Sequence, residues 1–348
     1  MTLQTQTITT KRITTRVLLR GDDGIPVLFI HGNLSNATWG AELLKTLPEG
    51  YRGIGYDQRG YGAADPEKKV DATKGLSDLA DDAIALLDYF NIEKAHIVGH
   101  SMGGSVLWWL MRKYPQRIIS ATQVAPGSPY GFGGCKGLDG QPVYEDFAGS
   151  GGGLINPRLI ERIQMHDTTT DDQFSPRNAL RNLIVKQGFI PEQEDELVEA
   201  MLSIHLGEQD YPGDMTQSPN WPYVAPGVWG VNNALSPKYA GDVTELLRID
   251  PKPPVLWVRG TDDLTVSDSA MADPGTLGKL GLLPNYPGED VYPPQPMVSQ
   301  TRAILEKYAA AGGIYEEYIM ANCGHSPYIE NLEQFNLKFH TFINAYDN

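Results

Sequence analysis

The sequence is poor in cysteine, with only Cys135 and Cys323 among its 348 residues. Two cysteines are too few for a disulfide framework or a cysteine-based zinc site, so we expect two buried thiols. Long hydrophobic runs are missing as well, and no apolar stretch approaches the roughly 18 residues that cross a bilayer. The first residues, MTLQTQTITTKRITTRVLLRG, lack the apolar segment of a secretory signal. We therefore expect a cytoplasmic protein with no membrane span.

Positive charge is scarce relative to negative charge. The chain has 28 Lys and Arg against 43 Asp and Glu, a net charge of −15. Because such a surface repels phosphate backbones, it argues against a general nucleic-acid partner and favours a neutral or cationic small molecule. The 41% of hydrophobic residues is ordinary for a globular protein and excludes a disordered chain or a coiled coil.

Strand and helix patterns alternate through most of the chain. Strands are predicted twice within 6–20 and at 26–30, 51–56, 94–99, 118–124, 254–258 and 314–320. Helices are predicted at 36–47, 77–91, 102–113, 299–311 and in a last segment with a stripe of Tyr328, Leu332, Phe335, Phe339 and Phe342. This alternation predicts an α/β fold with a mainly parallel, eight-stranded sheet flanked by helices.

The section from 127 to 241 departs from this alternation. It begins rich in glycine, and two helix starts then place a capping side chain before proline, at Asn156-Pro157 and Ser175-Pro176. A third helix is predicted at 191–206, and no strand run interrupts the section. The predicted organisation is a core of residues 1–126 and 242–348 with a mostly helical cap at 127–241.

The strongest motif is Gly99-His100-Ser101-Met102-Gly103-Gly104, a G-x-S-x-G sequence between a predicted strand and a predicted helix. A sharp strand-to-helix turn would hold the Ser101 hydroxyl above the sheet. The N–H of Met102, at the start of the helix, would then lie close to a developing oxyanion. The pattern predicts Ser101 as a nucleophile.

A serine nucleophile needs a base and an orienting carboxylate, and with this motif the chain order is Ser, Asp or Glu, then His. Only His325 and His340 follow the strand at 254–258. His340 falls inside the last predicted helix, whereas His325 directly follows the last strand. We therefore predict His325 as the base.

Two adjacent carboxylates, Asp262 and Asp263, follow the strand at 254–258. Spacing alone does not choose between them. The other common place for the acid is after the strand at 118–124, where no carboxylate occurs before Asp139. This absence favours the later position.

His31-Gly32-Asn33 follows the strand at 26–30. The N–H of Asn33 is a candidate second oxyanion donor, opposite that of Met102. One such donor contributes about 3–4 kcal/mol to transition-state stabilisation. We expect His31 to brace its loop rather than to transfer protons.

Taken together, these segments resemble the α/β-hydrolase-fold enzymes of the esterase, lactonase and C–C hydrolase branch. The resemblance covers about 1–126 and 242–348, and the family pattern after the seventh strand, laid on Gly260 to Val266, selects Asp263 as the acid. It also implies Asn33 and Met102 as oxyanion donors and 127–241 as a cap. The motifs that carry it are His31-Gly32, Asp57-Gln58-Arg59-Gly60-Tyr61-Gly62, Gly99 to Gly104, Gly260-Thr261-Asp262-Asp263 and Gly324-His325.

Ser101 departs from haloalkane dehalogenases and epoxide hydrolases, which carry Asp at that point of the motif. The cap and the segment 264–298 match no subfamily, so the substrate stays open. The resemblance implies a serine hydrolase acting on a neutral, apolar ester or lactone, without metal or cofactor. The alternatives are a C–C hydrolase of vinylogous diketones and a ligand receptor that keeps the triad. Candidate pocket aromatics are Trp108, Tyr130, Phe132, Trp221 and Trp229.

Overall fold

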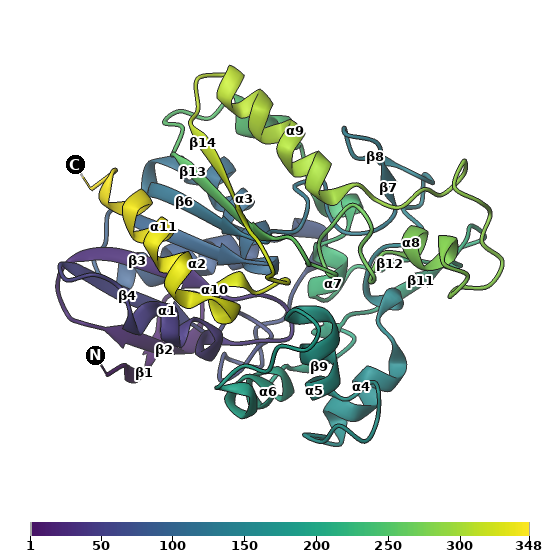
Figure 1. Ribbon diagram of the computed structural model, residues 1–348, viewed down its shortest axis with the longest axis horizontal. Helices are drawn as coiled ribbons and strands as arrows, with labels where there is room; N and C mark the ends of the chain where they lie inside the picture. Colours follow the sequence, from purple (N-terminus) through teal and green to yellow (C-terminus); the bar gives the residue numbers. More distant parts are fainter. Residues whose placement is uncertain (1, 348) are drawn as a thin grey trace.

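The centre of the molecule is an eight-stranded sheet with strand order β1-β2-β4-β3-β5-β6-β13-β14 (Figure 1). The computed structural model describes residues 2–347. The strands β1 and β2 are antiparallel additions at one edge, and all neighbours from β4 to β14 are parallel. The strands are β1 (Gln4–Thr9), β2 (Thr14–Arg20), β3 (Ile25–Ile30), β4 (Tyr51–Tyr56), β5 (Ala95–His100), β6 (Ile118–Val124), β13 (Val255–Gly260) and β14 (Tyr315–Met320). The predicted mainly parallel, eight-stranded sheet is confirmed.

The central strands are apolar along their whole length because both faces of the sheet are covered. In β3, Leu28 and Ile30 enter one core layer, while Val27 and Phe29 enter the other. All four side chains are inaccessible to solvent, as expected for a parallel strand between two helical layers. The first layer is covered by α2 (Ser77–Tyr89), α3 (Met102–Lys113) and α9 (Met297–Ala310), and the second by α1 (Ala41–Lys45) and α11 (Leu332–Asn344).

The last predicted helix is two helices in the structure. Tyr328 belongs to the short α10 (Pro327–Glu330), and α11 begins at Leu332. Tyr328, Phe335 and Phe339 are buried in the second core layer, whereas Leu332 is half-buried and outside this layer. The aromatic stripe therefore anchors the segment that directly follows His325.

Residues 127–241 lie between β6 and β13 in the chain and are less regular than predicted. The helices are α4 (Pro157–Gln164), α5 (Pro176–Ala179), α6 (Glu194–Leu202) and α7 (Val231–Ala234). Asn156 and Ser175 cap α4 and α5, as the proline signals predicted. The expectation of an insertion without strands is wrong. Three two-stranded ladders occur, β7–β8 (Cys135–Lys136, Gln141–Pro142), β9–β10 (Leu206–Gly207, Tyr211–Pro212) and β11–β12 (Met215–Gln217, Val224–Pro226). Strands this short leave no alternating pattern in a sequence.

The segment 264–298 contains a helix that was not predicted, α8 (Pro274–Lys279), and it packs on the cap (Figure 1). The indole N–H of Trp221 donates to Pro284 O at 2.9 Å, and the amide of Gln295 donates to Gly131 O at 2.9 Å. Two separate stretches of chain, 127–241 and 264–298, thus pack against each other. No helix among residues 2–347 combines the length and hydropathy of a membrane span.

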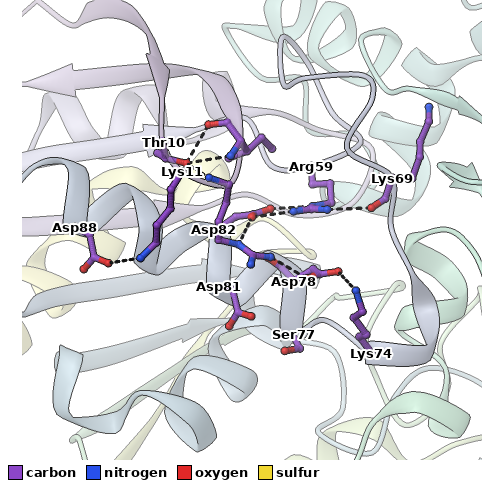
Figure 2. A network of polar contacts seen from close by, with 12 residues as sticks. Thr10, Lys11, Arg59, Lys69, Lys74, Ser77, Asp78, Asp81, Asp82 and Asp88 are labelled. Carbon is purple, nitrogen blue, oxygen red and sulfur yellow. Dashed lines mark hydrogen bonds and ion pairs between the residues drawn. The ribbon is translucent and has the colours of Figure 1, made fainter.

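A buried ion network fixes the loop after β4 to α2 (Figure 2). Asp82, 1% exposed, accepts two bonds of 2.9 Å from Arg59 and one of 2.8 Å from Arg12. Arg12 also forms an ion pair with Asp78, whose carboxylate lies 3.2 Å from the ammonium group of Lys74. Because a buried carboxylate is stable only when paired, this cluster specifies where the loop lies.

Candidate active site

Ser101 lies at the turn between β5 and α3 with φ 55° and ψ −119°. A non-glycine residue in such a conformation costs about 1–3 kcal/mol, which the surroundings must supply. Neighbouring glycines make the turn possible, because a Cβ on Gly99 would lie 2.4 Å from Gly103 O and one on Gly103 would lie 2.1 Å from Ile30 O. The Ser101 N–H donates to Val124 O at 2.9 Å and fixes the turn to β6.

The structure brings Ser101, His325 and Asp263 together in one hydrogen-bonded chain. Nε2 of His325 lies 2.8 Å from Ser101 Oγ, and Nδ1 lies 2.8 Å from Asp263 Oδ2. His325 is 2% and Asp263 is 6% exposed, so these contacts are shielded from water. This is the geometry of a nucleophile, a base and an orienting acid.

The two candidate acids point in different directions. Asp263 Oδ1 accepts the N–H groups of Thr265 and Val266, both at 2.8 Å, which turns its other oxygen toward His325. Asp262 instead faces outward and pairs with Lys186 at 3.2 Å. The choice that spacing left open therefore follows from the turn after β13.

The loop before Asn33 lies directly against the nucleophile, since a Cβ on Gly32 would be 3.0 Å from Ser101 Cβ. Among residues 2–347, no protein acceptor is recorded for the backbone N–H of Asn33 or for that of Met102, the first residue of α3. The side chain of Asn33 accepts from Tyr61 Oη at 2.7 Å and donates to Asn232 Oδ1 at 2.8 Å. The two backbone donors remain available to an oxyanion.

A match to the family model described as alpha/beta hydrolase fold covers residues 25–139, including β3 and the nucleophile turn. A solved serine hydrolase from Cycloclasticus zankles superposes with a TM-score of 0.60 at 18% identity, over 100% of both chains.

This chain has the α/β-hydrolase fold.

Two curated relatives each match about a third of this chain. The AB hydrolase superfamily protein YfhM of Bacillus subtilis is 34% identical over 115 residues, 32% of this chain and 40% of that protein. The bifunctional esterase/perhydrolase DCH of Acinetobacter calcoaceticus is 34% identical over 111 residues, 31% of this chain and 39% of that protein. The chain thus spans about two fifths of the length of these relatives, and the fold is what the likeness shows.

His31 braces the loop that carries Asn33, as expected. Its Nε2 accepts the Gln58 N–H at 3.0 Å, so the proton resides on Nδ1, which donates to Gly32 O at 2.8 Å. Complete burial lowers the pKa of His31 to about 4. The ring is therefore neutral near pH 7, with both nitrogens committed to structure.

Sequence reasoning missed four residues that fix the catalytic loops of the fold. Nε2 of His100 donates to His325 O at 3.0 Å, and burial holds the pKa of His100 well below its usual value. The others are Tyr61 and Asn232, which hold Asn33, and Glu330, which accepts the Gly324 N–H at 2.8 Å. Tyr61 was quoted only as part of a motif, and a lone Asn or Glu in a polar segment carries no pattern.

Trp108 and Trp221 are 3% and 5% exposed, and their indole N–H groups donate to the backbone at Gly127 and Pro284. Trp108 borders a small cavity beside Ser105 and Ser128, so it stays a candidate wall residue. Trp221 packs against the rings of Tyr286 and Tyr292, with centroids 5.3 and 4.8 Å away, and these are the surroundings of a packing residue. An aromatic residue in a sequence does not reveal whether its ring is covered.

The other three predicted aromatics are half-buried. Phe132 packs against the small cluster of Val266, Ala270 and Met297, which adjoins the Asp263 turn. Tyr130 lies over Gly140 in the β7–β8 turn. The backbone of Trp229 forms an isolated β-bridge with Asp71. Of these three aromatic residues, Phe132 is therefore the one that packs against a cluster next to Asp263.

Both thiols are buried, as predicted, and burial raises the pKa of Cys135 to about 12 and that of Cys323 to about 11. Neither is a reactive thiolate near pH 7. Within residues 2–347, no group of three or more His, Cys, Asp or Glu side chains is arranged to hold a metal ion.

Proposed function

We propose that the protein is a serine hydrolase that cleaves a carboxylic ester or lactone through an acyl-enzyme on Ser101. The observation that carries the proposal is the chain of two 2.8 Å contacts from Ser101 through His325 to Asp263. Two backbone N–H groups without a protein acceptor, on Asn33 and Met102, complete the requirements of acyl transfer.

In the first half-reaction, Ser101 Oγ attacks the carbonyl carbon while His325 Nε2 takes the hydroxyl proton. The carbonyl oxygen becomes an oxyanion, which the N–H groups of Asn33 and Met102 receive. As the C–O bond to the leaving group breaks, His325 passes the proton to the departing oxygen. The products are an alcohol and an acyl group esterified to Ser101. With a lactone, both remain one molecule.

In the second half-reaction, His325 takes a proton from water, whose oxygen attacks the acyl carbon. Collapse of the intermediate returns the proton to Ser101 Oγ and releases the acid. Asp263 keeps the Nδ1–H tautomer and stabilises the imidazolium that forms in each step. These steps consume water alone and require no cofactor.

We propose a small, neutral and apolar substrate. The net charge of −15 disfavours polyanions. The half-buried Phe132, beside the Asp263 turn, is the best-supported aromatic contact for such a molecule.

The decisive measurement is steady-state turnover of the wild type and Ser101→Ala on a matched panel of an aryl acetate, a longer acyl ester, a small lactone, a macrolactone and a vinylogous diketone. We expect repeated turnover of an ester or lactone. Ser101→Ala should lower kcat by about 10⁴-fold or more while the melting temperature stays near that of the wild type.

Turnover of the diketone alone would replace the proposal by C–C hydrolysis. A single slow event that leaves a covalent adduct on Ser101 would favour a receptor. Near-wild-type turnover by Ser101→Ala would refute the mechanism.

A further inference from the structure

A short piece of the cap lies across both loops that carry the acid and the base. The segment from Leu183 to Lys186 begins in the last two residues of the π-helical turn (Leu180–Ile184) that continues α5. Leu183 O accepts from Thr265 Oγ1 at 2.8 Å, two residues after the acid. The Lys186 N–H donates to Glu330 at 2.9 Å, and its ammonium group lies 3.2 Å from Asp262. This piece of cap is therefore tied to both loops.

Glu330 is the centre of these contacts on the side of the base. Its carboxylate accepts the Gly324 N–H at 2.8 and 3.0 Å, the Ser326 N–H at 3.3 Å and the Lys186 N–H at 2.9 Å. Gly324 and Ser326 are the two chain neighbours of His325. One carboxylate thus holds both sides of the base and the end of the cap segment.

The cap backbone also touches the base loop directly. A Cβ on Gly324 would lie 2.5 Å from Lys186 N and 2.8 Å from Val185 C. Glycine is needed at position 324 because the backbones of the two segments approach so closely. Displacing the cap segment would remove packing from Gly324 and a hydrogen bond from Glu330 in the same movement.

We propose that Glu330 is a positioning residue that couples docking of the 183–186 cap segment to the orientation of His325. With the segment docked, the carboxylate is shared between cap and base loop, and His325 Nε2 faces Ser101. With the segment lifted, the loop loses support on one side and the base is less well aligned. The reading of His325 as base rests on the proposed function, whereas the coupling of the two segments does not.

The chemistry of the site requires a carboxylate. An ionised carboxylate has acceptors on both oxygens, whereas the amide of glutamine replaces one acceptor by a donor. In Glu330→Gln, at least one of the N–H groups of Gly324, Ser326 and Lys186 would face the NH2 group. Glu330→Gln therefore weakens the coupling with little change in volume.

The first test compares Glu330→Gln with Lys186→Ala. Lys186→Ala removes the ion pair to Asp262 and the 3.2 Å hydrogen bond to Asn322 Oδ1, both made by an exposed ammonium group, but keeps the backbone N–H that reaches Glu330. Because a small misplacement of a base is costly, we expect Glu330→Gln to lower kcat about 10–100-fold with KM little changed. We expect the same loss in the rate at which an organophosphate probe labels Ser101, and Lys186→Ala to stay within about threefold of the wild type.

The pH profile separates positioning from mere folding. Because Glu330→Gln removes a negative charge that faces His325, the acidic limb of kcat/KM should move to lower pH in this variant and stay in place in Lys186→Ala. A second variant, Lys186→Pro, removes the backbone donor itself. The loss of kcat in Lys186→Pro should not add fully to the loss of kcat in Glu330→Gln, because both variants break the same contact.

Amide hydrogen exchange reads the coupling without any substrate. Glu330→Gln should speed exchange both in 183–187 and in 324–326, and Lys186→Ala should speed neither. Unchanged exchange in both segments would overturn the coupling, whatever the activity. Labelling of Ser101 at the wild-type rate with an unmoved pH profile would overturn the positioning role. A wild type that neither turns over the panel nor reacts with the probe would instead refute the proposed function.

Discussion

Different kinds of interaction stabilise the sheet and the cap. In the sheet, side chains such as Leu28 and Phe29 are buried by simple alternation, and their neighbours on α3 and α11 follow helical periodicity. In the cap, single polar side chains hold irregular backbone. Asn233, fully buried, accepts the Gly152 N–H at 2.9 Å and donates to Asp214 O at 2.8 Å. Repetition specifies one region, and individual residues specify the other.

The two regions contribute different residues to the candidate site. The proposed nucleophile, acid and base all follow strands of the sheet, where many equivalent contacts set the position of the backbone. The cap adds Asn232 beside Asn33 and the 183–186 segment beside His325. Because the 183–186 segment contacts the loop of His325, we expect a change in the cap to reach the candidate site through these few contacts.

The largest expected effect tests the sheet side of the comparison. Asp263→Asn should lower kcat/KM by about 10⁴-fold, because the amide no longer holds the productive tautomer of His325. Asp262→Asn is the matched control. It loses an exposed ion pair and should change kcat/KM by less than about threefold. Steady-state kinetics of the two variants on one ester would check this, and equal losses would contradict the assignment of Asp263.

The next effect tests the cap. Asn233→Ala leaves buried N–H and C=O groups at Gly152, Gly227 and Asp214 without their partner. We expect the free energy of local unfolding of the cap to fall by about 2–4 kcal/mol. Hydrogen exchange should show fast exchange in the cap with α2 and α3 still protected. Leu28→Ala, the counterpart in the sheet, should instead lower the global free energy of unfolding by about 2–5 kcal/mol.

The smallest effect concerns pH, to which His31 in the sheet region and Asp273 beside the cap respond in opposite directions. His31, under the sheet's catalytic edge, has a folded pKa of about 4 against 6.5 when unfolded, so its stability contribution is lost as pH falls through that range. Asp273, the N-cap residue of α8, has a pKa raised by burial from 3.8 to about 6, and its Oδ1 has no hydrogen-bond partner among residues 2–347. Its contribution is lost as pH rises from about 4 to 6.

Asp273→Asn should therefore be more stable than the wild type at pH 8, by about 1–3 kcal/mol, and the difference should shrink toward pH 4. Thermal unfolding at several pH values measures this. Asp242→Asn is the control of opposite sign, because hydrogen bonds to Thr244 lower the pKa of Asp242 to about 2. A pH-independent difference for Asp273→Asn would show that Asp273 ionises normally.

Much of the sheet was predictable because its residues repeat a pattern. The apolar run at 26–30 and the glycines around Ser101 have physical requirements that can be read in a sequence. The decision between Asp262 and Asp263 came from resemblance, since the direction of a side chain in a turn depends on hydrogen bonds to Thr265 and Val266.

The cap could not be predicted in the same way. Its ladders are two or three residues long, and its contacts join distant positions such as Trp221 and Pro284. Glu330 was missed for the same reason, because only the folded chain brings Lys186 beside it.

The strand order has a consequence for synthesis on the ribosome. In the sheet, β6 lies between β5 and β13, but roughly 130 residues of chain separate Val124 from Val255. At translation rates of about 5–20 residues per second, β6 presents an unpaired edge for on the order of ten seconds while the cap is being made. We expect the nascent chain to be most prone to misassociation in that interval, and the partly folded cap to be the part of the chain available to shield that edge.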